Sequence, residues 1–194
     1  MRLSFRILTL AAAVAAASCG DVARTGRSPV QIVIVNMIAA SGSDPTKFTG
    51  VLQSDVLTKG SVFNDIGSAD LQIQLKNPGI APTSLNQVTV DRIHVEYVRA
   101  DGHNVPGVDV PFAFDGAATG TLKQDGTKST LIFELVRHVA KIESPLVQLT
   151  NNPNIITTIG RITFYGHDMA GNEMNATGQI QIDFANFADS SSGS

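Results

Sequence analysis

Four histidines are the side chains of this sequence best suited to acid–base or metal chemistry: His94, His103, His138 and His167. His94 and Glu96 are two residues apart, so a strand projects both from one face, where two such groups can ligate a metal. No third ligand is evident beside them. The pattern therefore favours a solvent-facing charged pair, and we predict no metal site here.

His167 and Asp168 are adjacent at the end of an expected strand, beside a turn, where functional residues often lie. Neighbouring residues on a strand point to opposite faces, so these two do not form a His–Asp relay with each other. The carboxylate of Asp168 is instead expected to accept hydrogen bonds from the backbone of the turn.

The segment Asp101–Asp109, with the sequence DGHNVPGVD, offers oxygen ligands for calcium. It lacks the D-x-D-x-D-G spacing and the closing Glu of a calcium loop, so a polar loop between strands is favoured. The sequence also holds no G-x-S-x-G, S-x-x-K, H-E-x-x-H, P-loop or dinucleotide fingerprint. We therefore assign no catalytic residue and no cofactor.

The composition is that of a globular chain with one domain. It has 194 residues, of which 43% are hydrophobic and 16% charged, and its formal net charge is −3. Lys and Arg form no cluster, so the chain lacks the basic patch of a nucleic-acid-binding protein. We expect no nucleic-acid partner.

The single cysteine, Cys19, follows a run of alanines near the start of the chain. Arg2 and Arg6 precede the apolar segment Ile7–Ala17, which is the order of charge and hydropathy in a secretory signal peptide. The apolar segment is shorter than the roughly 20 residues that a membrane-spanning helix needs. The sequence therefore predicts export.

The four residues Ala16-Ala17-Ser18-Cys19 resemble the lipobox of bacterial lipoproteins, in which the thiol is acylated and the chain is cleaved just before it. The resemblance covers only these residues, and Ala16 stands where Leu is usual. The alternative is an ordinary signal peptide with an incidental cysteine. The residue after Cys19 is Gly20 rather than Asp, and by resemblance to the sorting rule of diderm bacteria this indicates the outer membrane.

These features divide the chain into four parts. We expect a signal peptide at 1–18, a lipidated tether at 19–29, a folded domain at 30–187 and a disordered tail at 188–194. Removing residues 1–18 lowers the number of basic residues from 14 to 12 against 17 acidic ones, a charge of −5. The acyl chains at Cys19, and not electrostatic attraction to anionic lipid, would then hold the protein at the membrane.

Alternation of apolar and polar residues with period two dominates the folded domain and predicts strands. The expected inward-facing residues are Leu71, Ile73 and Leu75; Val108, Val110, Phe112 and Phe114; Leu131, Phe133 and Leu135; Ile162 and Phe164; and Ile180, Ile182 and Phe184. The run VQIVIVNMI at 30–38 is nearly all apolar and predicts a strand buried on both faces.

Three segments are less regular. In VTVDRIHVEYVRA the alternation changes phase near Asp91, which indicates either a β-bulge or a break between two strands. The segment SPLVQLTNN predicts a short helix, capped by Ser144, with Pro145 at its first position and an end at Asn151–Pro153. ELVRHVAKI, at 134–142, allows a helix but continues a strand pattern, and we predict a strand.

The turn Asp168–Asn172 (DMAGN) joins two alternating strands, and its Gly and Asn tolerate positive φ. This hairpin resembles the final hairpin of bacterial immunoglobulin-like domains, where a D-x-A-G-N turn often joins the last two strands. The sequence therefore predicts an all-β fold, an immunoglobulin-like antiparallel β-sandwich of seven to nine strands with at most one short helix.

The leading functional hypothesis is a lipid-anchored envelope protein with a binding or structural role. Its expected partners are the membrane, through Cys19, and other envelope proteins or polymers. The alternative is a hydrolase of envelope polymers, which would be favoured by a cleft that collects two or more of Asp101, His103, Asp109 and His167. Carbohydrate binding is a third option, but Tyr97 and Tyr165 offer a thin aromatic platform in a chain without Trp.

Overall fold

The computed structural model describes residues 26–187. The predicted signal peptide 1–18, the predicted lipid-attachment residue Cys19 and the predicted tail 188–194 lie outside the described residues. Within 26–187 the chain forms eight strands: β1 (Val30–Ala40), β2 (Val51–Asp55), β3 (Asp65–Leu75), β4 (Val88–Val98), β5 (Phe114–Leu122), β6 (Ser129–Val136), β7 (Ile156–Asp168) and β8 (Glu173–Ala185). Three short helices join them: the 3₁₀ helices η1 (Ser84–Asn86) and η2 (Leu146–Asn151), and α2 (His138–Ile142).

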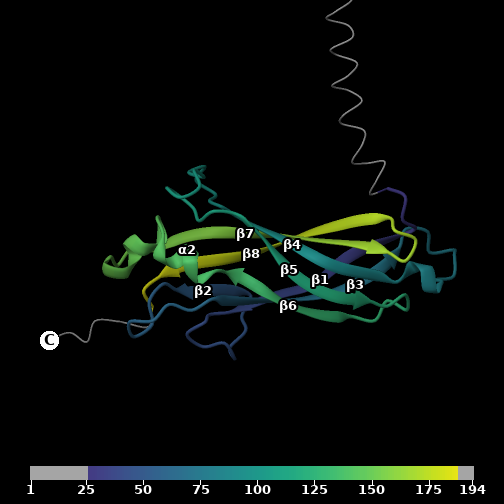
Figure 1. The fold of residues 1–194 in the computed structure, drawn as a ribbon, viewed down its shortest axis with the longest axis horizontal. Coiled ribbons are helices and arrows are strands. Elements are labelled where there is room, and N and C mark those ends of the chain that lie inside the picture. Colours follow the sequence, from purple (N-terminus) through teal and green to yellow (C-terminus); the bar gives the residue numbers. More distant parts are fainter. Residues whose placement is uncertain (1–25, 188–194) are drawn as a thin grey trace, which may run out of the picture.

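The strands form two packed sheets, with the order β1-β3-β6 in one and β2-β8-β7-β4-β5 in the other (Figure 1). Every pairing is antiparallel except that of β2 with β8, which is parallel. The predicted all-β sandwich is therefore confirmed. Its larger sheet carries one parallel edge strand that the sequence did not indicate.

The core lies between the two sheets and is built by the alternation seen in the sequence. Phe133 and Phe164 meet edge to face, with ring centroids 5.4 Å apart. Tyr97 packs against Phe184, and its hydroxyl donates a hydrogen bond of 2.8 Å to the backbone carbonyl of Leu135. The polar end of this buried tyrosine is thus satisfied, as burial requires.

The phase change near Asp91 is a β-bulge within one continuous strand. The register of β4 shifts between Val90 and Arg92 against both of its neighbours, β5 and β7. One extra residue therefore separates the two alternating halves of the strand, and the apolar side chains on both sides of it stay in the core. Val90 and Ile93 are both fully buried.

Two predicted strands differ from the structure. The first, β1, is not buried on both faces, because it is the edge strand of the three-stranded sheet and leaves Val35 46% exposed. The second, predicted around Val108–Phe114, is mostly a loop: Val108 and Phe112 are exposed, and β5 begins only at Phe114. The alternation of this loop therefore marks no strand.

The segment after β6 is helical and not extended as predicted. The side-chain oxygen of Asn64 accepts a hydrogen bond of 2.6 Å from the backbone N–H of His138, where α2 begins. The expected helix after Ser144 does form, as the 3₁₀ helix η2, with Pro145 immediately before its first residue. The sequence predicted at most one short helix for the whole sandwich, and residues 26–187 hold three: η1, α2 and η2.

The sandwich is elongated, and its strands run from one end to the other (Figure 1). We call N-terminal end the one that holds Gly26–Pro29, η1 and the turn Asp168–Asn172, and C-terminal end the one that holds α2, η2 and Phe187. The eleven residues of β1 connect the two ends. At about 3.3 Å per residue they are roughly 33 Å apart.

Candidate binding site at the C-terminal end

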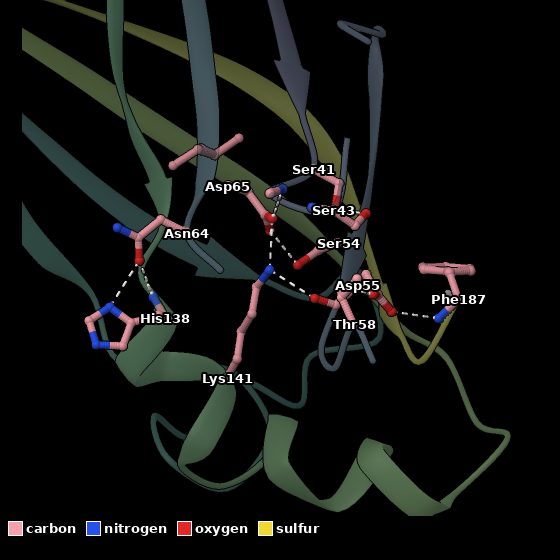
Figure 2. A network of polar contacts seen from close by, with 12 residues as sticks. Ser41, Ser43, Ser54, Asp55, Thr58, Asn64, Asp65, His138, Lys141 and Phe187 are labelled. Carbon is pink, nitrogen blue, oxygen red and sulfur yellow. Dashed lines mark hydrogen bonds and ion pairs between the residues drawn. The ribbon is translucent and has the colours of Figure 1, made fainter. Parts of the chain in front are cut away.

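A fully buried ion pair lies at the C-terminal end. Nζ of Lys141, on α2, is 2.7 Å from Oδ1 of Asp65, the first residue of β3, and neither side chain is exposed (Figure 2). Nζ also donates a hydrogen bond of 2.9 Å to the backbone carbonyl of Asp55 on β2. The charge of Lys141 therefore has two oxygen partners, which a buried ammonium group needs.

Asp65 has two further donors. The hydroxyl of Ser54 donates to Oδ2 over 2.6 Å, and the backbone N–H of Gly42 donates to Oδ1 over 2.8 Å. Burial raises the pKa of Asp65, and Lys141, Ser54 and Gly42 oppose that rise. The network joins the loop after β1 to β2, β3 and α2, so it fixes the C-terminal end of both sheets.

A second set of contacts lies around this pair. The carboxylate of Asp55 accepts hydrogen bonds from the hydroxyl of Thr58 and from the backbone N–H of Phe187, the latter over 2.8 Å. The hydroxyls of Ser41 and Ser43 are 3.0 Å apart (Figure 2). The end of the chain after β8 is thereby held against β2.

Next to this network lies an open polar hollow of about 400 Å³. It is lined by Ser41, Ser43, Asp44, Lys47, Thr49, Val51, Leu52, Gln53, Asp55 and Phe187. Its volume lies in the range of small-ligand sites. The lining offers hydroxyls, an amide, carboxylates and one ammonium group beside the edge strand β2, so it suits a polar ligand or an extended chain.

His94 and Glu96, both on β4, each make a surface contact with a neighbouring strand. Nδ1 of His94 is 3.2 Å from Asp115 on β5, and Glu96 is 3.4 Å from Arg161 on β7. These side chains are partly exposed, as expected of a solvent-facing pair. Among residues 26–187, no group of three or more His, Cys, Asp and Glu side chains is placed to hold a metal ion.

The loop Asp101–Asp109 is closed by its own hydrogen bonds. The guanidinium of Arg99 binds the carboxylate of Asp101, with a shortest contact of 2.5 Å, and lowers the pKa of Asp101 to about 2. The backbone N–H of His103 also donates to Asp101, and that of Val105 to Asp109. The loop is polar and lies at the surface, as predicted.

His167 is far from that loop. It lies opposite Thr89 near the start of β4, whereas the loop follows the end of the same strand. Its Nδ1 is 3.3 Å from Asp91, in an exposed pair. The structure therefore brings Asp101 and His103 together, but does not bring His167 to them.

The carboxylate of Asp168 accepts hydrogen bonds from the turn that follows it, as the sequence predicted. Its Oδ1 accepts hydrogen bonds from the backbone N–H groups of Ala170 and Asn172 and from the side-chain amide of Asn172, at 2.9–3.1 Å. Gly171 has φ +81°, which a residue with a side chain rarely adopts. Burial alone would raise the pKa of Asp168, but hydrogen bonds from Asn172, Ser28 and the Ala170 N–H lower it.

Sequence reasoning missed the ion pair and the hollow. The available signal was Lys141 itself, a charged residue within the apolar run HVAKI. A buried lysine needs a partner. Nothing in the local pattern shows that this partner is Asp65, which lies 76 residues earlier.

Comparison with known protein families and with curated proteins finds no match for this chain. Within the described part of the chain, no helix has the length and apolar character needed to cross a membrane. The class that fold and site define is thus an all-β sandwich with a polar hollow beside a buried ion pair at one end.

Proposed function

We propose that this protein is a lipid-anchored component of a bacterial envelope that binds a polar partner in the hollow at its C-terminal end. The observation that supports this most directly is the separation of the two ends. The chain joins the sandwich at Gly26–Pro29, about 33 Å from the hollow by the length of β1. An anchor at Cys19 would leave the hollow facing away from the lipid.

The length of the linking segment supports the same arrangement. Six residues lie between Cys19 and Gly26, and the seven Cα–Cα steps of this segment span at most about 25 Å when fully extended. The N-terminal end of the sandwich would therefore stay close to the membrane. Several acyl chains on one cysteine would hold it there firmly. Gly20 favours the outer membrane of a diderm bacterium.

The partner we propose is another envelope protein or a polymer of the envelope. The hollow is bordered by β2, which is paired only with β8 and is the edge strand of its sheet. An edge strand offers backbone groups to an extended chain, and the side chains of Lys47 and Asp44 offer charge to its polar groups.

The anchor is tested by metabolic labelling with palmitate. The wild-type protein should incorporate the label and float with membranes, and Cys19→Ala should do neither. A mature wild-type chain that is soluble, with a free thiol and no lipid mass, would contradict the proposal.

The hollow is tested by photo-crosslinking in intact cells. A photoreactive residue at Gln53, which is exposed on β2 within the hollow, should form a discrete adduct. The same residue at Gln179, exposed in the middle of β8, is the matched control. Lys47→Glu should abolish the adduct at Gln53. Equal adducts from both positions, or none from Gln53, would contradict a binding role for the hollow.

A further inference from the structure

Three large apolar side chains are exposed at the N-terminal end of the sandwich, on two segments that lie side by side. Ile80 is 56% exposed, Leu85 59% and Met169 58%. They come from two segments: the connection between β3 and β4, which contains η1, and the turn between β7 and β8. We call these three residues the apolar tip.

The two segments are joined by hydrogen bonds. The backbone N–H of Met169 donates to the carbonyl of Gln87, the residue after η1, over 3.2 Å. Within the η1 segment, the side-chain oxygen of Asn86 accepts a hydrogen bond of 2.7 Å from the backbone N–H of Thr83. The apolar tip is therefore held by a defined backbone framework.

The apolar tip lies beside the point where the chain joins the sandwich. A shallow hollow of about 270 Å³ is lined by Ile80, Thr83 and Asn86 and also by Pro29. Ser28 is buried, and the carbonyl of Pro29 accepts a hydrogen bond of 2.9 Å from the backbone N–H of Lys76. Ser28 and Pro29, the last two residues of the predicted tether, are thus fixed against the domain.

The charges around the apolar tip suit a lipid headgroup layer. Exposed cations at this end are Arg27, Lys76, Lys123 and Lys128, and the exposed acids are Asp91, Asp125 and Glu173. The full chain has a net charge of −3, so this end is less negative than the molecule as a whole. An apolar patch with cations around it is the composition of a surface that lies in the membrane interface.

We infer that the apolar tip inserts into the boundary between headgroups and acyl chains of the membrane that holds Cys19. This inference rests on the lipid anchor of the proposed function. Because at most about 35 Å of extended chain separates Cys19 from Pro29, the apolar tip is always within reach of the bilayer. The contact gives the sandwich a fixed orientation, with its C-terminal end directed away from the membrane.

The test uses the full lipidated chain reconstituted in phosphatidylcholine vesicles that contain a spin-labelled lipid as quencher. Acylation leaves no free thiol, so Met169→Cys creates a unique site for a fluorescent label. Val147→Cys on η2, at the other end of the sandwich and also exposed, is the matched control. We expect the label at position 169 to be quenched at least about twofold more strongly than that at 147.

Two further measurements separate the possible outcomes. Adding Ile80→Glu and Leu85→Glu to the labelled Met169→Cys protein should reduce its quenching to the level of the control. If the chain floats with the vesicles but quenching at 169 and 147 is equal, the apolar tip does not insert into the membrane, and the proposed lipid anchor is unaffected. A chain that carries no lipid and does not float overturns the proposed function as well. Leu85→Cys provides a second labelling site if Met169→Cys fails to fold.

Discussion

Two buried aspartates, one at each end of the sandwich, are stabilised in different ways. Asp65, at the C-terminal end, is 0% exposed and pairs with Lys141, 76 residues away in the chain. Asp168, at the N-terminal end, is 1% exposed and binds N–H groups that lie within four residues. One carboxylate depends on a distant charge, and the other depends on its own turn.

The difference shows how the surroundings decide the behaviour of the same side chain. Burial raises the pKa of Asp65 despite its cation, because the loss of water around the carboxylate outweighs the attraction of Lys141. Burial acts on Asp168 too, but hydrogen bonds from Asn172, Ser28 and the Ala170 N–H lower the pKa of Asp168. Desolvation thus outweighs the partners of Asp65, whereas at Asp168 the hydrogen bonds of the turn outweigh desolvation.

The largest expected effect comes from removing the distant charge. Lys141→Met keeps most of the side-chain volume but leaves Asp65 buried without its cation, and should lower the free energy of unfolding by about 3–5 kcal/mol. Urea denaturation of the purified domain measures it. Asp65→Asn combined with Lys141→Met should cost less than the sum of the two single variants, because no buried charge then remains. Additive losses would show that the two residues are not coupled.

Replacing Asp168, at the N-terminal end, should have a smaller effect on the free energy of unfolding, and this effect should depend on pH. Asp168→Asn replaces one accepting oxygen with a donor and should cost about 1–3 kcal/mol near pH 7. The pKa of Asp168 is lower in the folded state than in the unfolded state, where it is about 3.9. The ionised carboxylate therefore stabilises the fold fully at pH values above the unfolded pKa. This stabilisation is lost as the pH falls through the folded-state pKa. Denaturation at several pH values should therefore show wild type and variant converging in acid. A difference that does not change with pH would contradict the role of the charge.

The backbone of the same turn should contribute less. A Cβ at Gly171 would meet no atom within 4 Å, so Gly171→Ala tests backbone conformation alone. Because φ is +81°, we expect a loss of about 1–2 kcal/mol, read from the shift in the denaturation midpoint. Gly50→Ala is the control, since its site is equally open and its φ is not positive. An equal loss at both positions would mean that φ is not the cause.

The smallest effect is expected at His167. Its pair with Asp91 is exposed on both sides, and such pairs contribute little. His167→Ala should change the free energy of unfolding by less than about 0.5 kcal/mol. If the variant folds normally but loses a measured binding or hydrolytic activity, this end of the molecule holds a functional site, and the hydrolase alternative gains support.

The same comparison shows what the sequence could predict. The Asp168 turn and the Asp91 bulge are local, so their patterns are visible in a short stretch of residues. The pair of Lys141 with Asp65 and the parallel pairing of β2 depend on contacts between distant parts of the chain, and no local pattern contains them. The hollow at the C-terminal end is built from these distant contacts, so it could not be predicted either.

β5 was missed for a different reason. Only the first and last of its inward-facing positions, Phe114 and Leu122, carry large side chains, and the three between them are Gly116, Ala118 and Gly120. A Cβ at Gly120 would lie 2.9 Å from the side chain of Leu131, and one at Gly116 would lie 3.3 Å from Ile93. Side chains from neighbouring strands therefore take the space at these positions. Because neighbouring side chains fill that space, β5 lacks the regular large apolar residues by which a strand is recognised in a sequence.

The parallel pairing of β2 with β8 also has a consequence for folding, because β2 can join its sheet only after β8 is present. Val51 lies beside Gln181, so β2 has no partner in its sheet until the last strand of the domain has been made. Contacts between residues so far apart in the chain form slowly, because a long loop must close first. The pair of β1 with β3 can form early, because both strands lie in the first part of the chain, whereas the hollow is completed only when Phe187 reaches Asp55. A chain whose synthesis stops before β8 would thus lack the complete hollow.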